Sequence, residues 1–221
     1  MNKLSTNQHK EKIYNLLSSF YDKLFFVLKP GHSQAGRYLT NEKTKQVLEV
    51  GVGTGLTFEH YAAGTNITAV DLSQGMLSKA EQKVADFPQL KIQLQVMDAQ
   101  KLEFADNQFE CSYAPSLLSV VPQPQKLISE MIRVTRPGGK IIIISHFEGN
   151  RSQDQLASRL LGPLTQRLFG FRMDLKTQLI EKTEGAQLVF KKKVNPVGPY
   201  HLSHLVVLEK LPVEKKKSSE R

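Results

Sequence analysis

Short apolar runs alternate with segments of helical periodicity from about residue 46 to residue 210 of this chain. Apolar runs bounded by turn residues are typical of buried strands, and their alternation with helices is typical of a mostly parallel sheet. The pattern predicts seven strands, at Gln46–Gly51, Asn66–Asp71, Lys91–Met97, Gln108–Ala114, Lys140–His146, Ala186–Val194 and Leu202–Lys210.

Two helices between these strands have clear start and stop signals. Ser73 is a good N-cap for a helix that reaches Asp86, and Pro124 suits the first turn of a helix that reaches Val134 and stops at Pro137-Gly138-Gly139. No helical pattern separates the last two strands, which flank a Pro-Val-Gly-Pro turn at residues 196–199, so we expect an antiparallel hairpin there.

The first predicted strand runs into a glycine-rich loop. Gly51, Gly53 and Gly55 occupy alternate positions where the strand gives way to a helix, which lets backbone N–H groups lie against a small ligand. A dinucleotide fingerprint needs its third glycine one place later, where this chain has Leu56. Glu49 also stands just before the loop, where it would repel a pyrophosphate.

Acidic residues stand at or near the ends of three successive predicted strands, namely Glu49, Asp71 and Asp98. An acid in the position of Asp71 can accept hydrogen bonds from ribose hydroxyls. For any one of these acids, a helix cap or a solvent-facing position is an equally good explanation. The three together favour a cationic, phosphate-free cofactor such as S-adenosylmethionine, which carries a sulfonium and an ammonium group.

This set of motifs resembles the class I S-adenosylmethionine-dependent methyltransferases. The resemblance implies an α/β, Rossmann-like fold: a seven-stranded, mostly parallel sheet with one antiparallel strand, order 3-2-1-4-5-7-6, helices on both faces and an N-terminal amphipathic helix. It implies S-adenosylmethionine as cofactor, with Glu49 near the methionine amino end, Asp71 on the ribose and Asp98 reading the adenine. The full set of implied cofactor residues is Arg37, Glu49, Gly51, Gly53, Gly55, Asp71, Leu72, Met76, Asp98, Ala99, Gln100 and Ala114.

Length and composition bound the domain organisation. A chain of 221 residues suits one α/β domain with elaborations. We expect a helical cap and membrane-contact segment at 1–45, the methyltransferase domain at 46–210 with a substrate-side insertion at 150–183, and a charged tail at 211–221. Apolar residues at a helical period between Ile13 and Leu28 give the first segment a stripe that either packs on the core or meets a membrane.

The net charge and the single cysteine bear on the binding partners and the cellular compartment. Thirty basic and 21 acidic residues give a formal net charge of +9, which favours polyanions such as nucleic acid or an anionic membrane surface. Cys111 lies within a predicted strand, which indicates a core residue in a reducing compartment. Neither a signal-peptide pattern nor an apolar run of spanning length is found, so we expect a cytoplasmic protein, peripherally associated with the inner face of the membrane.

The loop after the fourth predicted strand argues against several substrates. Its sequence is Ala114-Pro115-Ser116-Leu117. N-methyltransferases that act on adenine or glutamine resemble one another in an Asn/Asp-Pro-Pro-aromatic loop at this place, and this chain has neither the Asn/Asp nor the aromatic residue. Cys111 is placed in the strand, where it cannot serve as a cytosine nucleophile. The chain has no tryptophan for a base-stacking platform, so we expect no nucleic-acid partner.

The remaining motifs resemble the ubiquinone/menaquinone C-methyltransferase group, and within it the bacterial phospholipid N-methyltransferases that act on phosphatidylethanolamine. The stretches that carry this resemblance are Gly36-Arg37, Glu49 to Leu56, Ser119-Val120-Val121-Pro122, Arg133 to Gly139, Ser145-His146-Phe147 and Leu168 to Arg172. Four functions remain open, in this order of preference. The first is a phospholipid N-methyltransferase and the second a C-methyltransferase of a quinone precursor. The third is a nucleic-acid or protein methyltransferase, and the fourth a non-enzymatic regulator that binds the cofactor.

Methylation of an amine needs a neutral nitrogen, so a histidine or tyrosine near the site can take or relay a proton. Tyr21, His146, Tyr200 and His201 are the candidates, and for Tyr21 a core position is equally good. Arg37 can pair with the cofactor carboxylate, with a lipid phosphate or with a surface acid. We expect no metal, and the sequence leaves the oligomeric state open.

Overall fold

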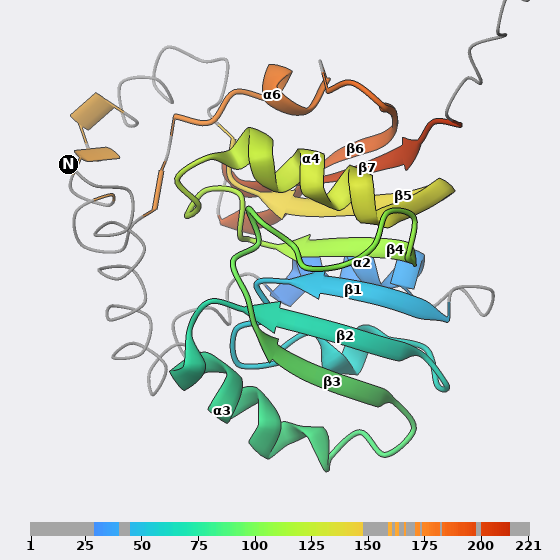
Figure 1. The fold of residues 1–221 in the computed structure, drawn as a ribbon. Helices are drawn as coiled ribbons and strands as arrows, with labels where there is room; N and C mark the ends of the chain where they lie inside the picture. The colour runs from blue at the N-terminus through green and yellow to red at the C-terminus, as the bar shows by residue number, and fades with distance from the viewer. Residues whose placement is uncertain are drawn as a thin grey trace, which may run out of the picture.

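A seven-stranded sheet forms the centre of the computed structural model (Figure 1). The structure describes residues 29–39, 45–147, 159–160, 162–163, 166, 171–172, 174–181, 183–197 and 200–212. Its strands are β1 (Gln46–Val50), β2 (Asn66–Asp71), β3 (Lys91–Val96), β4 (Phe109–Pro115), β5 (Thr135–Ser145), β6 (Ala186–Val197) and β7 (Tyr200–Lys210). Its helices are α2 (Lys29–Leu39), η2 (Phe58–His60), α3 (Gln74–Val84), α4 (Pro124–Val134) and α6 (Gln178–Glu181).

The strands are arranged in the order β3-β2-β1-β4-β5-β7-β6, which confirms the predicted fold class. β1 to β5 pair in parallel, whereas β7 runs antiparallel to both β5 and β6. The order reverses at β1, since β2 lies on one side of it and β4 on the other. In such sheets ligands bind outside the carboxyl ends of the strands at this reversal.

Helices cover both faces of the sheet because successive strand residues point to opposite sides. One core joins α2 and α3 to the face that carries Val47, Tyr113 and Ile142. The other joins α4 and α6 to the face that carries Leu48 and Ile141. Figure 1 shows α4 and α6 on one side of the sheet, with α2 behind it. Cys111 is buried in the first of these cores, and burial raises the pKa of its thiol to about 12.

The fifth strand departs from the prediction at its start. α4 ends at Val134 as predicted, but β5 begins directly at Thr135 and contains the Pro-Gly-Gly run that we expected to lie outside it. The pairing of β4 with β5 is irregular between Phe109 and Cys111, and Gly138 takes a positive φ of 76° there. At Gly139 a Cβ would lie 2.7 Å from the carbonyl oxygen of Glu110. Gly139 therefore lets the backbones of β4 and β5 approach closely, and Gly138 permits the left-handed conformation within β5.

The N-terminal and insertion predictions fall mostly on residues that the structure does not describe. Residues 1–28 and most of 148–170 lie outside the described ranges, and so does the tail from residue 213. In the part of the cap that is described, Ala35 and Leu39 of α2 are fully buried against the sheet. The domain boundaries at residues 45 and 210 and the insertion at 150–183 stay predictions.

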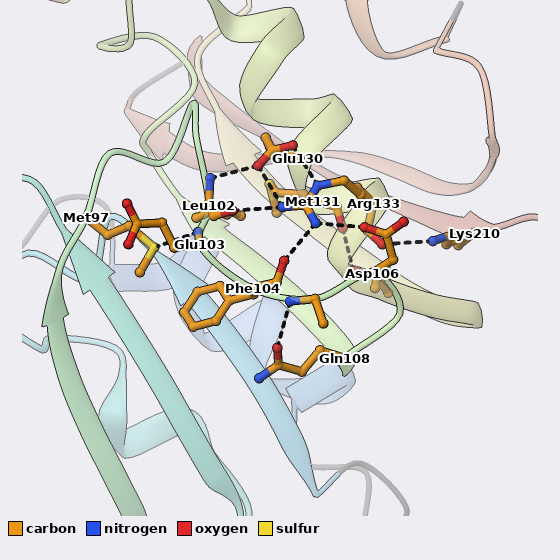
Figure 2. A network of polar contacts seen from close by, with 12 residues as sticks. Met97, Leu102, Glu103, Phe104, Asp106, Gln108, Glu130, Met131, Arg133 and Lys210 are labelled. Carbon is orange, nitrogen blue, oxygen red and sulfur yellow. Dashed lines mark hydrogen bonds and ion pairs between the residues drawn. The ribbon is translucent and has the colours of Figure 1, made fainter.

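A clamp around Arg133 holds the loop between β3 and β4 against α4 (Figure 2). Its guanidinium donates to both carboxylate oxygens of Glu130, to the carbonyls of Leu102 and Phe104, and to Asp106, at 2.7–2.9 Å. These five bonds use all five N–H donors of an arginine side chain. These hydrogen bonds lie near the amino ends of β4 and β5, opposite the carboxyl ends where the glycine loop follows β1. They hold the loop between β3 and β4 in place.

Candidate cofactor and substrate site

The predicted site residues of the sheet lie along the carboxyl ends of β1 to β5. This row of strand ends is called the ligand edge below, and it is distinct from the edge strands β3 and β6. The glycine loop follows β1, Asp71 ends β2, Asp98 follows β3 and His146 follows β5. Because these strands are parallel and adjacent, residues that end them share one edge although they lie far apart in sequence.

The glycine loop is tied to the end of β2 by backbone groups. Gly51, Gly53 and Gly55 have φ values of 74°, 55° and 75°, in the left-handed region that glycine adopts without penalty. Gly53 N–H donates to Asp71 Oδ2 at 2.9 Å, and Ser73 N–H donates to Oδ1 of the same carboxylate at 2.9 Å. Burial raises the pKa of Asp71, against the backbone hydrogen bonds that lower it. Asp71 thus holds the glycine loop in place, and its role toward a ribose stays a prediction.

Asp98 accepts two hydrogen bonds from Gln100, another predicted cofactor residue. Its Oδ1 accepts from Gln100 N–H at 2.9 Å and from Gln100 Nε2 at 3.0 Å. The side-chain oxygen of Gln100 accepts in turn from Gln123 N–H at 2.9 Å, just before α4. Gln100 therefore connects the loop after β3 to the beginning of α4.

Glu49 lies inside the protein rather than on the surface of the ligand edge. It is fully buried, and its two carboxylate oxygens accept from Thr57 Oγ1 and from the Tyr61 hydroxyl, each at 2.6 Å. Burial raises the pKa of Glu49 to about 7, while both hydrogen bonds lower it and the charge of Asp71 raises it. The predicted partner of Glu49 was the cofactor's amino end, and within the described residues its partners are these two hydroxyls.

Sequence reasoning missed the polar cluster around Glu49. Thr57 and Tyr61 follow it by eight and twelve residues, and a carboxyl buried at the end of an apolar strand requires such donors. That requirement was the available signal. A second buried pair, His32 of α2 and the Tyr113 hydroxyl, lies on the same face with 2.8 Å between Nδ1 and oxygen. Burial, aided by the charge of His60, lowers the pKa of His32 to about 4.

The other predicted cofactor residues lie at or below the ligand edge. Met76 is buried in the first turn of α3, where its N–H donates to the Ser73 hydroxyl. Ala99 and Ala114 are buried within the core under α4, and Leu72 is half-buried. Arg37 belongs to α2, and its side chain lies outside the described set. Their roles toward the cofactor stay predictions.

The candidate proton acceptors are placed only in part. The His146 ring lies 5.6 Å from the ring of Phe171, a residue within the predicted insertion at 150–183. β5 ends where Ser145 pairs with His204, so Tyr200 and His201 lie on the portion of β7 that extends beyond β5 at the ligand edge. Their side chains, and the whole of Tyr21, lie outside the described residues.

The residues at the ligand edge fit the chemistry of S-adenosylmethionine. The charged side chains that end β1 to β3 are the carboxylates Glu49, Asp71 and Asp98, which suit hydroxyls, an ammonium and a sulfonium. The glycine loop presents backbone at the same edge. Among the described residues, no group of three or more histidine, cysteine or acidic side chains could hold a metal ion, and no helix is long and apolar enough to cross a membrane.

Known proteins with similar sequences give the family. Residues 48–143 match the family description of a methyltransferase domain. The chain is 33% identical over 159 residues to a phosphatidylethanolamine N-methyltransferase of Cereibacter sphaeroides, which covers 72% of this chain and 78% of that protein. It is 29% identical over 192 residues to a ubiquinone/menaquinone biosynthesis C-methyltransferase of Desulfotalea psychrophila, covering 83% and 74%. A demethylmenaquinone methyltransferase of Paenarthrobacter aurescens is 32% identical over 152 residues, covering 65% and 58%.

Solved structures agree on the fold. A methyltransferase of Methanosarcina mazei superposes with a TM-score of 0.63 at 15% identity, over 79% of this chain and 96% of that one. The N-methyltransferase NodS of Bradyrhizobium japonicum gives a TM-score of 0.62 at 15% identity, over 81% and 94%. The chain therefore belongs to the S-adenosylmethionine-dependent methyltransferases. It is an enzyme of this family, with S-adenosylmethionine as its cofactor.

Proposed function

We propose that this enzyme transfers methyl groups to the amine of phosphatidylethanolamine, of its mono- and dimethyl derivatives, or of both, toward phosphatidylcholine. The observation that carries the proposal is the likeness to the phosphatidylethanolamine N-methyltransferase of Cereibacter sphaeroides, which extends over 78% of that protein. The likeness to the demethylmenaquinone methyltransferase reaches only 58% of its length at similar identity.

The site supports an amine acceptor through its hydrogen-bonding and proton-accepting groups. S-adenosylmethionine supplies an electrophilic methyl group, which the lone pair of a neutral amine takes as the carbon–sulfur bond breaks and the electron pair stays on sulfur. Asp71 would hold the cofactor's ribose hydroxyls and Asp98 its adenine at the ligand edge, and a cofactor held in this way would determine the position of the acceptor. His146 accepts the proton that the ammonium form of the substrate releases, with Tyr21, Tyr200 and His201 as the further candidates.

Edge strand β6 supports an encounter with an anionic membrane, where such a lipid must be met. Leu188, Val189 and Phe190 are 44%, 49% and 36% exposed, although they are apolar. The next three residues, Lys191–Lys193, are exposed lysines. Apolar side chains enter the headgroup boundary while each nearby lysine gains about 1 kcal/mol from anionic lipid. With the predicted N-terminal helix, this surface would hold the enzyme peripherally on the inner face of the cytoplasmic membrane.

Lipid analysis tests the function directly. We expect purified enzyme, S-adenosylmethionine labelled in its methyl group and vesicles of phosphatidylethanolamine with anionic lipid to yield labelled mono-, di- or trimethylated lipid. The absence of label in lipid, together with label in a demethylated quinol offered in parallel, would replace the proposal by the quinone reaction. That second candidate is kept because the C-methyltransferase of Desulfotalea psychrophila aligns with 83% of this chain.

Vesicle sedimentation tests the membrane surface. Replacing Lys191–Lys193 by glutamine should weaken binding to anionic vesicles by roughly tenfold or more, because three favourable charges near the surface are lost. A matched variant with Lys45, Lys91 and Lys101 changed to glutamine removes the same charge from other exposed sites and should bind nearly as the wild type. Equal losses in both variants would mean that net charge alone drives binding.

A further inference from the structure

Two residues other than glycine have a left-handed backbone in the described part of the chain. Asn107 and Ser116 both have a φ of 58°. Asparagine tolerates this region, and the Asn107 side-chain oxygen accepts from Lys210 Nζ at 2.7 Å, so its conformation is accounted for. Serine rarely adopts it, and an outlier of this kind needs a reason.

The Ser116 hydroxyl provides no such reason within the protein. Its oxygen is buried and has no hydrogen-bond partner among the described residues. A buried hydroxyl without a partner is unfavourable, and such groups are uncommon in folded proteins. Glycine would relieve the backbone at this position and remove the hydroxyl as well. Serine at position 116 is therefore unfavourable for folding in two ways, through its backbone conformation and through its buried hydroxyl.

Ser116 stands at the ligand edge, in the loop after β4. It directly follows β4, and its N–H donates to the Ile144 carbonyl at 2.8 Å, two residues before His146. The next side chain, Leu117, lies against the glycine loop, so that a Cβ on Gly51 would be 2.8 Å from its Cδ1. The residue as a whole is half-buried. The hydroxyl can occupy any of three staggered positions about χ1.

We propose that the Ser116 hydroxyl accepts a hydrogen bond from an N–H of the methyl-accepting amine and so orients the nitrogen lone pair. The inference rests on the proposed amine substrate and adds to it a residue that distinguishes the successive acceptors. The reacting neutral nitrogen has two N–H groups in phosphatidylethanolamine, one in the monomethyl lipid and none in the dimethyl lipid. The contribution of Ser116 should therefore vanish at the last methylation.

The test compares kcat/KM of wild type and Ser116→Ala on vesicles of each of the three lipids. We expect a loss of about tenfold on the first two lipids, the value of one hydrogen bond, and a loss below about twofold on the dimethyl lipid. The affinity for S-adenosylmethionine, measured by calorimetry, should stay within about twofold of the wild type. Ser116→Gly should raise Tm while it lowers turnover, because it relieves the backbone and removes the hydroxyl together.

Two control variants separate this role from loop packing. Ser119→Ala removes another buried hydroxyl without a described partner, from a fully buried residue of the same loop, and should leave all three reactions unchanged. Asn107→Gly relaxes the other left-handed residue, at the opposite edge, and should alter Tm without altering the lipid preference.

The outcomes separate the inference from the proposed function. Equal losses of Ser116→Ala on all three lipids, no loss at all, or a parallel loss of cofactor affinity would overturn the role of Ser116 while leaving the amine substrate intact. A wild-type enzyme that methylates none of the three lipids would overturn both the proposed function and this inference.

Discussion

A buried carboxyl beneath the glycine loop should make the stability of this enzyme depend on pH near neutrality. Glu49 is fully buried, and burial raises the pKa of its carboxyl from 4.5 to about 7. The proposed perturbation is Glu49→Gln, which keeps the shape and removes the titration. An amide can still serve both neighbours, because its oxygen accepts from one hydroxyl and its NH₂ donates to the other, whether Thr57 or Tyr61.

The sign of the effect follows from the raised pKa. The fold favours the protonated form of Glu49, so its contribution is fully present below pH 4.5 and is lost as pH rises through about 7. A rise from 4.5 to about 7 corresponds to roughly 3 kcal/mol. The variant should therefore equal the wild type within about 1 kcal/mol at low pH and exceed it by roughly 3 kcal/mol above pH 8.

Urea unfolding at steps from pH 4.5 to 8.5 measures this difference, with m-values checked for two-state behaviour. Carboxyls that titrate the other way, such as Glu130, whose pKa the Arg133 side chain lowers, are present in both proteins and cancel in the difference. A difference that stays constant across the pH range, or a variant that loses stability at high pH, would show that Glu49 is not held as a neutral acid.

Three further predictions concern the ligand edge and the clamp. Asp71→Ala should weaken S-adenosylmethionine binding by about 2–3 kcal/mol, through lost hydrogen bonds to the ribose and a loosened glycine loop, and wild-type affinity in calorimetry would remove the assignment. His146→Ala and Tyr21→Phe should lower turnover with cofactor affinity intact. Full activity of both variants at every pH would show that neither side chain handles the proton. Arg133→Lys should lower the free energy of unfolding by roughly 2 kcal/mol, since an ammonium cannot reproduce five directed bonds, and unchanged urea denaturation would contradict this.

The sequence predicted the sheet and the placement of its acids because both depend on local patterns. Alternating apolar strands and helical segments determine a parallel sheet, and parallel strands bring their carboxyl ends to one edge. Asp71, the last residue of β2, and Asp98, just after β3, could therefore be placed at the same edge of the sheet. The predicted start of β5 was wrong because Gly138 and Gly139 suggested a loop, whereas Gly138 supplies a positive φ within the strand and Gly139 lets the backbones of β4 and β5 approach closely.

The contacts of these residues could not be predicted in the same way. The sequence analysis placed Glu49 near the cofactor's amino end, which stays a prediction, but it did not anticipate that Glu49 is buried and accepts hydrogen bonds from Thr57 and Tyr61. The direction of a side chain at the end of a strand depends on register, and a one-residue difference exchanges the two faces. The left-handed backbone of Ser116 has no signal in a sequence, because serine is rarely found there.

The two edges of the sheet differ in how well their polar groups are satisfied. At the Arg133 clamp every guanidinium N–H has an acceptor, and its hydrogen bonds lower the pKa of Glu130, so these charges favour folding. At the ligand edge, burial raises the pKa values of Glu49 and Asp71, and Ser116 holds an unfavourable backbone. Stability is thus given up at the edge where we propose that the cofactor binds, as is common at functional sites. If S-adenosylmethionine binds here as proposed, its positive charge would favour the charged form of Asp71, and binding would recover part of the free energy that folding gives up at this edge.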